Sequence, residues 1–364
     1  MKKLLLILLL APLFVFPAYA EGASGQDAVF DIEAMTRELP EEAIEIGGEL
    51  RLDGSYDSAG ALERLWNKVL ASLAENLRSA CRVMVGIFAL ILLCAVSSSV
   101  VQIPRQNDAV QIAGCAAVSL MLAGGMNSLF AEALTVLSDL DNYGRAVLPA
   151  VYTAAAASGA VASSSAKYGL ACLAVDLMME AAQRLIIPLI CAVLAMSVCA
   201  GLFDNALLRT GIKLGKRLTV LLLSGLTLGF TAFLSITGLV SGSADALTVK
   251  AARSLIATAV PVVGRMLSDT ADSVLTAASL VKNSAGAFGM IAVCAVCAAP
   301  FVSLAVHRLL LSVAAAAAEM MAGERLARLL NDLGGVMSML LGLVGCFGLM
   351  LFFCIVAALR TVSG

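Results

Sequence analysis

Long uncharged apolar stretches recur along the chain. Each holds about 20 residues or more, which is enough for a helix to cross about 30 Å of hydrocarbon. The apolar residues are continuous and do not alternate with polar ones, so they favour helices over the strands of a membrane β-barrel. The pattern predicts an all-α polytopic membrane protein with about six transmembrane helices, near residues 83–103, 110–131, 185–203, 218–244, 283–306 and 333–359.

The composition agrees with this pattern. Of the 364 residues, 60% are apolar and only 14% are charged. A soluble domain carries about 25% charged residues. The low charge therefore supports a chain that is largely embedded in a membrane.

The first 20 residues differ from the other apolar runs. Lys2 and Lys3 precede a short apolar core, and Ala18 and Ala20 supply small residues at the positions that a signal peptidase reads. This pattern predicts a secretory signal peptide at residues 1–20. The alternative is an uncleaved first membrane helix. Either interpretation exports the segment that follows.

Two segments lie between residue 20 and the first predicted span. Residues 21–60 carry eleven acidic residues against Arg37 and Arg51, and we expect a flexible exported arm there, either a solvated spacer or a docking tail for a basic partner. In residues 61–82, apolar side chains recur at helical spacing around Trp66, the only tryptophan. This segment predicts an amphipathic helix on the lipid surface or against a partner helix.

Charge in the loops sets the expected orientation. The densest basic cluster, Arg209, Lys213, Lys216 and Arg217, marks a cytoplasmic loop. A seventh uncharged stretch, 146–166, is rich in small residues, and counting it as a span would place that cluster outside. We therefore expect residues 146–183 to form a helical pair that dips into the membrane and returns, and the C-terminus to lie outside.

A second outward-facing connection has a similar make-up. Residues 251–282 contain Pro261 in an apolar setting, as the first connection contains Pro149. Each follows an inward-to-outward span and precedes a return span. This likeness predicts two re-entrant or interfacial helical hairpins within a parallel internal repeat.

The second connection is also charged. Pro261 and Gly264 favour a helix break, and Arg265, Asp269 and Asp272 share one helix face downstream. A charge at the bilayer centre costs about 2.5–3.5 kcal/mol on insertion scales, so these residues line an aqueous cavity or rest at the outer surface. The candidate pore-lining or structural positions are Pro149, Pro261, Gly264, Arg265, Asp269, Asp272, Lys282 and Asn283.

No pattern of residues points to catalysis. The sequence has no H-E-x-x-H, no phosphate-binding loop with lysine and no G-x-S-x-G. Cys294 and Cys297 form a C-x-x-C within an apolar run, and with one histidine, His307, we expect packing and no metal site. We expect no enzyme activity, no cofactor and no nucleic-acid partner.

The stretch TVKAARSLIATAVPVVGRMLSDTADSVLTAASLVKNSAG, residues 248–286, resembles the central signature of the stage III sporulation protein AE family. YGRAVLPAVYTAAAASGAVAS, residues 143–163, and the Trp66 helix also fit. The resemblance implies a multi-pass protein of the mother-cell membrane that surrounds the forespore. It further implies a channel or scaffold subunit whose partners are the other stage III sporulation A-operon proteins and, through them, stage II sporulation protein Q.

Two rival interpretations remain at this level. The half-buried charges and the suspected repeat also fit a stand-alone secondary transporter for a small solute. A pure assembly scaffold without a conduit fits as well, and a homo-oligomer is compatible with all three.

Overall fold

Every regular element in the described part of the chain is a helix. The computed structural model describes residues 44–46, 57–100, 104–157, 161–203, 205–259 and 264–359. Side chains are described for these residues except 100, 104–107, 161–163, 166, 233–259 and 264–282. The predicted signal peptide at 1–20 and nearly all of the predicted acidic arm lie outside the described residues.

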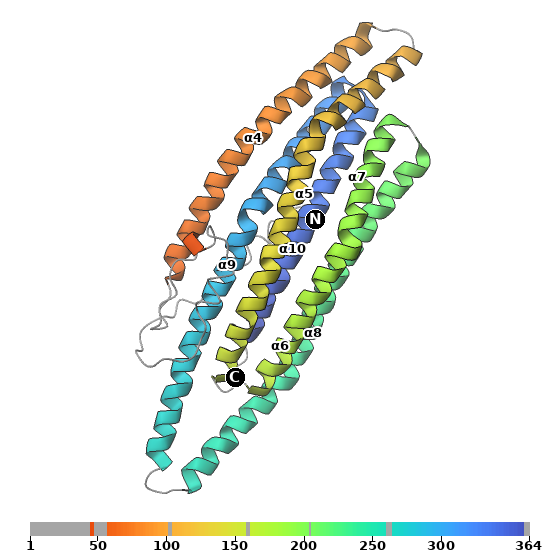
Figure 1. Cartoon of the computed structure of the whole chain (residues 1–364). Coiled ribbons are helices and arrows are strands. Elements are labelled where there is room, and N and C mark those ends of the chain that lie inside the picture. The colour runs from red at the N-terminus through yellow and green to blue at the C-terminus, as the bar shows by residue number, and fades with distance from the viewer. Residues whose placement is uncertain are drawn as a thin grey trace.

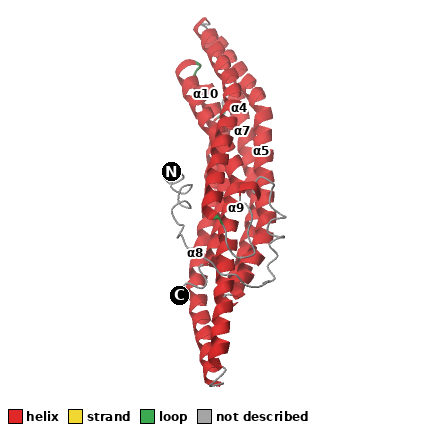
Figure 2. Cartoon of the chain, turned by 90° about the vertical axis from the view of Figure 1, so that its left-hand side faces the viewer, coloured by secondary structure: helices red, strands yellow, loops and turns green. Residues whose placement is uncertain are grey.

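The helices form an elongated antiparallel bundle (Figure 1). They are α4 (Ser58–Val100), α5 (Pro104–Ala157), α6 (Val161–Ala181), the π-turn η2 (Ala182–Ile186), α7 (Ile187–Leu202), α8 (Ala206–Ala259), α9 (Gly264–Met321) and α10 (Glu324–Leu359). Since η2 joins α6 to α7 without a break, these three elements form one rod. Viewed after a quarter turn, the bundle is long and narrow (Figure 2).

The helices are much longer than a bilayer requires. At 1.5 Å per residue, the 58 residues of α9 extend over about 85 Å, whereas a hydrocarbon core is about 30 Å thick. Each long helix therefore joins an apolar run to a more polar stretch. In α4, for example, the amphipathic segment 61–82 and the apolar run that starts at Val83 form one continuous helix.

Five helical stretches in the described part of the chain are long and apolar enough to cross a membrane. They contain the predicted runs 83–103 (to Ser99), 110–131, 185–203 (to Leu202), 283–306 and 333–359. The sixth predicted run, 218–244, falls on α8, whose side chains are described only to residue 232.

The two predicted connections are built from the tips of long helices. Pro149 lies inside α5, which continues to Ala157. The segment 146–183 is therefore the end of α5 with α6, continuous with its neighbours and not an inserted pair of short helices. At the second connection, α8 ends at Ala259 and α9 begins at Gly264, and residues 260–263 lie outside the described residues. The dipping arrangement of both connections stays a prediction.

Consecutive helices turn at alternate ends of the bundle. In Figure 1, α4, α7 and α9 end at the upper end of the bundle, where α5, α8 and α10 begin. α5 and α8 end toward the lower end, where α6 and α9 begin. The α9–α10 turn uses Gly323 at φ 107°, a left-handed conformation that suits glycine. Since α10 packs against α5, α6, α7, α8 and α9, it is the central helix.

Candidate functional site: a polar layer between two sets of apolar helices

The apolar runs of α4, α5 and α7 lie side by side. Gly86 of α4 faces Met121 of α5, and Gly114 of α5 faces Cys94 of α4. Gly201 of α7 faces Cys115 of α5. These contacts place runs 83–103, 110–131 and 185–203 at one level of the bundle. We call them the first apolar set.

The runs of α8, α9 and α10 are also in register with one another. A Cβ added at Gly348 of α10 would lie 2.7 Å from Cys297 Sγ of α9, and one added at Gly345 would lie 3.4 Å from Phe301. Gly342 of α10 faces Leu223 of α8. Runs 218–244, 283–306 and 333–359 therefore form a second apolar set.

The apolar runs of α5 and α9 are displaced from each other along the bundle axis. The start of the α5 run lies beside the α9–α10 turn, because Gln111 faces Gly323. The end of the same run lies beside the end of the α9 run, because Ser303 Oγ donates to Glu132 Oε2 at 3.3 Å. The runs of α5 and α9 thus barely overlap, and their centres differ by about 20 residues, or about 30 Å. This displacement is about one hydrocarbon thickness.

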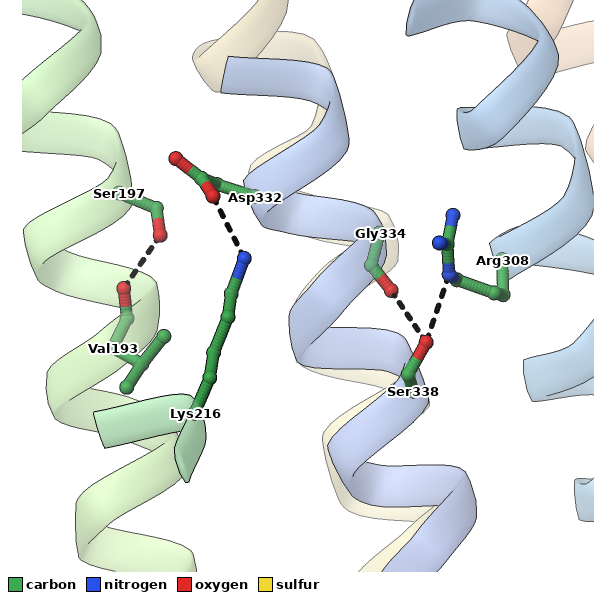
Figure 3. A network of polar contacts seen from close by, with 7 residues as sticks. All are labelled: Val193, Ser197, Lys216, Arg308, Asp332, Gly334 and Ser338. Atoms are coloured by element: carbon green, nitrogen blue, oxygen red, sulfur yellow. Dashed lines mark hydrogen bonds and ion pairs between the residues drawn. The ribbon is translucent and has the colours of Figure 1, made fainter. Parts of the chain in front are cut away.

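Polar side chains gather where the two sets meet. Lys216 of α8 and Asp332 of α10 form an ion pair at 2.7 Å, with each side chain 26% exposed. On the other side of α10, Arg308 Nε of α9 donates to Ser338 Oγ at 2.8 Å, and Ser338 Oγ donates to the Gly334 carbonyl at 3.1 Å (Figure 3). All three charged residues stand within two residues of the ends of their apolar runs.

Two adjacent glycines make this arrangement sterically accessible. A Cβ at Gly334 would lie 2.9 Å from Arg308 Nη1, and a Cβ at Gly335 would lie against Lys216 Nζ. The missing side chains let a guanidinium and an ammonium approach α10 from opposite sides. The Gly334–Gly335 pair therefore has a packing role within this layer.

A second part of the layer joins α5 to α9. Ser303 is 3% exposed and contacts Glu132, which is half-buried. One turn further along α9, His307 Nδ1 lies 2.8 Å from the Ser303 carbonyl. An acidic group and an imidazole thus flank one buried serine. We refer to Glu132, Lys216, Ser303, His307, Arg308, Asp332 and Ser338 together as the polar layer.

The lower halves of the helices carry further cross-links. Tyr152 Oη donates to the Cys354 carbonyl at 2.9 Å, and Lys167 Nζ donates to the Ala357 carbonyl at 3.5 Å, so α5 and α6 both bind the end of α10. On the surface, Arg145 pairs with Asp141 at 3.2 Å and with Asp176 at 2.7 Å. These contacts fix α6 against α5 and α10.

Helix registration is the physical task that these contacts perform. A register slip of α8 along α10 would separate Lys216 from Asp332, and partly buried charges are costly to leave unpaired. A slip of α9 would break the hydrogen bond from Arg308 to Ser338. Among the described residues, no group of three or more metal-binding side chains gathers.

Most of the positions predicted from the sequence belong to residues whose side chains lie outside the described ones. Pro261 lies outside the described residues, and Gly264, Arg265, Asp269, Asp272 and Lys282 lie on the first five turns of α9 with their side chains outside them. Asn283 is exposed on α9. Pro149 is half-buried in α5, and its carbonyl accepts a hydrogen bond from Thr153 Oγ1 at 2.8 Å. Their proposed pore-lining role stays a prediction.

The sequence held a signal for the polar layer. Lys216, Arg308 and Asp332 each border an apolar run, and Lys216 also belongs to the basic cluster that marks the expected cytoplasmic loop. Their meeting depends on the mutual register of three helices. The Glu132–Ser303 contact depends on the displacement between the two sets, for which hydropathy carries no signal.

The described fold defines a helical bundle with several segments able to span a membrane. The sequence model of stage III sporulation protein AE matches residues 54–361, so the chain belongs to that family. It is 22% identical over 159 residues to stage III sporulation protein AE of Bacillus subtilis (strain 168). That similarity covers 44% of this chain and 40% of the relative. No solved structure matches the chain.

Proposed function

We propose that the protein is a membrane subunit of a mother-cell-to-forespore channel complex that acts during endospore formation, as a channel wall or scaffold. Family membership over residues 54–361 carries the proposal, because the family's name assigns it to stage III of sporulation. The other stage III sporulation A-operon proteins would be its direct partners. Stage II sporulation protein Q would be reached through them.

The architecture supports a non-catalytic role of this kind. Long helices extend well beyond one hydrocarbon thickness, and α10 is enclosed by five other helices. Such a bundle can hold fixed geometry on both sides of a membrane. A channel subunit or a scaffold needs this property, whereas a stand-alone transporter must also change shape around a substrate.

A complementation experiment tests the role. In the source organism, removal of the gene is expected to stop late forespore gene expression and spore formation, and the intact chain is expected to restore both. Normal spore yield without the gene would overturn the proposal. Robust flux of a solute by the purified chain alone in liposomes would favour the transporter instead.

The pore-wall version has its own test. Cysteines placed at Ser268 and Ser273 should react with a membrane-impermeant thiol reagent from the exported side of the assembled complex. If both stay unreactive from either side, the first turns of α9 are not a water-lined wall. Retained spore formation in those variants serves as the control for assembly.

A further inference from the structure

A stripe of large, exposed apolar side chains runs along α4 in its first half. Trp66, Leu70, Leu73 and Leu77 are 41–54% exposed. They follow one another at intervals of four, three and four residues, so they share one helix face. In Figure 1, α4 lies at the edge of the bundle, and it packs mainly against α9 and α5.

The bundle itself is held by a different face of the helix. In this half of α4, Ala61 is buried and Leu65 packs against the hydrophobic core, whereas the four residues of the stripe are exposed. We call Trp66, Leu70, Leu73 and Leu77 the α4 stripe. Within the described residues, nothing buries it.

Bulk lipid is a poor occupant for this stripe. The same turns of α4 expose Glu75, Arg78 and Arg82, and charged side chains in hydrocarbon are costly. The uncharged run begins only at Val83. This half of the helix therefore belongs outside the hydrocarbon.

The lipid surface is no better. An amphipathic helix binds a bilayer surface when it lies flat on it. Here the stripe and the apolar run belong to one continuous helix, Ser58–Val100. If that run enters the bilayer, Trp66 stands about 25 Å further along the axis from Val83. Most of the stripe then projects into water and needs a protein partner.

The spacing and the flanking charges point to a second copy of this chain. Intervals of four, three and four are those of a two-stranded coiled-coil seam. Copies inserted in one membrane share an orientation, so their α4 helices run parallel. The positions that border the stripe are uncharged, namely Asn67, Val69, Ala74 and Asn76, while Lys68, Glu75 and Arg78 lie away from it. Two stripes can meet without bringing like charges together.

We propose that the protein forms a homodimer in which the α4 stripes of two copies pack in parallel. Trp66, Leu70, Leu73 and Leu77 of each copy then contact the same residues of the other. Such a contact is isologous, so it closes at two copies. The proposal does not rest on the proposed function, because it concerns how copies associate and not what the complex conducts.

Cysteine cross-linking tests the seam in the full chain. Cys81, Cys191 and Cys199 are the exposed cysteines, and serine at these three positions gives a background with little reactive thiol. Leu73→Cys places a thiol on the stripe, and Glu75→Cys places one on the charged side of the same turn. Two copies with different tags are produced together in membranes and treated with a short thiol cross-linker.

We expect Leu73→Cys to give a product that holds both tags, at least tenfold more than Glu75→Cys gives. No such product, or equal amounts from both variants, overturns the proposal. A Leu73→Cys product that joins one tag to a different protein also overturns it and assigns the stripe to another partner.

A second measurement does not depend on engineered thiols. Leu73→Asp combined with Leu77→Asp should reduce co-purification of the two tags by at least tenfold, whereas Glu75→Gln should leave it unchanged. Membrane level and thermal unfolding of the charged variant report whether the bundle still folds. Unchanged co-purification in a folded Leu73→Asp, Leu77→Asp variant contradicts the seam.

Discussion

The two apolar sets are alike in hydropathy but differ in what their side chains contact. In α9 and α10, 56% and 61% of the most apolar stretch is buried inside the bundle. In α4, in α5 and in the rod of α6 and α7, the share is 28%. The runs of α9 and α10 are therefore apolar largely because they form the protein core. The first set turns its apolar side chains outward, where lipid or another protein chain can cover them.

This difference bears on how a membrane would enclose the bundle. The runs of α5 and α9 are displaced by about 30 Å, so one hydrocarbon layer of that thickness covers mainly one of these two runs. At the level of the first set, α10 carries Arg325 and Arg328. Leu329, next to them on α10, lies against Gly201 of α7. Hydropathy treats all the runs as equivalent spans. Burial separates those that face outward from those that fill the core.

The largest expected difference in stability is between a substitution that leaves a cavity in the core and one on an outward-facing residue. Phe347 of α10 is fully buried, whereas Leu120 of α5 is 78% exposed. Phe347→Ala should destabilise the bundle by about 3–5 kcal/mol because it leaves a cavity. Leu120→Ala removes few contacts within the protein. Thermal unfolding in detergent measures both.

Similar losses from the two variants would contradict the contrast between a buried and an outward-facing set. Near-equal effects would mean that Leu120 is covered by another chain or that α10 is not the central helix. A conservative Phe347→Leu variant should fall between Phe347→Ala and the parent.

The polar layer joins the sets, and breaking it should have the next largest effect. Lys216→Met leaves Asp332 partly buried without its partner, and we expect a loss of about 2 kcal/mol, reduced from the value for a fully buried pair because both groups are 26% exposed. Adding Asp332→Leu should recover much of that loss. Unfolding of the single and double variants forms a double-mutant cycle.

Additive losses in that cycle would contradict a direct contact between Lys216 and Asp332. The register of α8 against α10 would then rest on other contacts, such as that of Leu223 with Gly342. Lys213→Met serves as the control, since Lys213 is an exposed cation one turn away on the same helix.

Two glycines allow a contact in the core to be compared with an open position by adding a side chain. At Gly348, a Cβ would lie 2.7 Å from Cys297 Sγ, and at Gly124 it would meet no atom within 4 Å. Gly348→Val should cost about 1–3 kcal/mol by overpacking the contact of α9 with α10. Gly124→Val should be close to neutral. The yield of folded protein from membranes and its unfolding temperature compare them.

The sequence allowed the apolar runs and the helical fold to be predicted because continuous apolar stretches carry a strong local signal. It did not allow the displacement of the two sets to be predicted. That displacement depends on contacts such as Glu132 with Ser303, between positions 171 residues apart. Pro149 shows the same limit, because a proline predicts a break on local grounds, while packing of Val147 and Val151 in the core favours a continuous α5.

The smallest effect is expected at the surface, where Arg145 links α5 to α6. Arg145 is 59% exposed and Asp176 is 57% exposed, so solvent screens their pairing. Arg145→Gln should change stability by about 0–1 kcal/mol, well below the effect of Lys216→Met. A loss as large as that of Lys216→Met would mean that lipid or a partner excludes water from Arg145. The lower tips of α5 and α6 would then be embedded, as the re-entrant interpretation of residues 146–183 requires, so this substitution tests that interpretation as well as the ion pair.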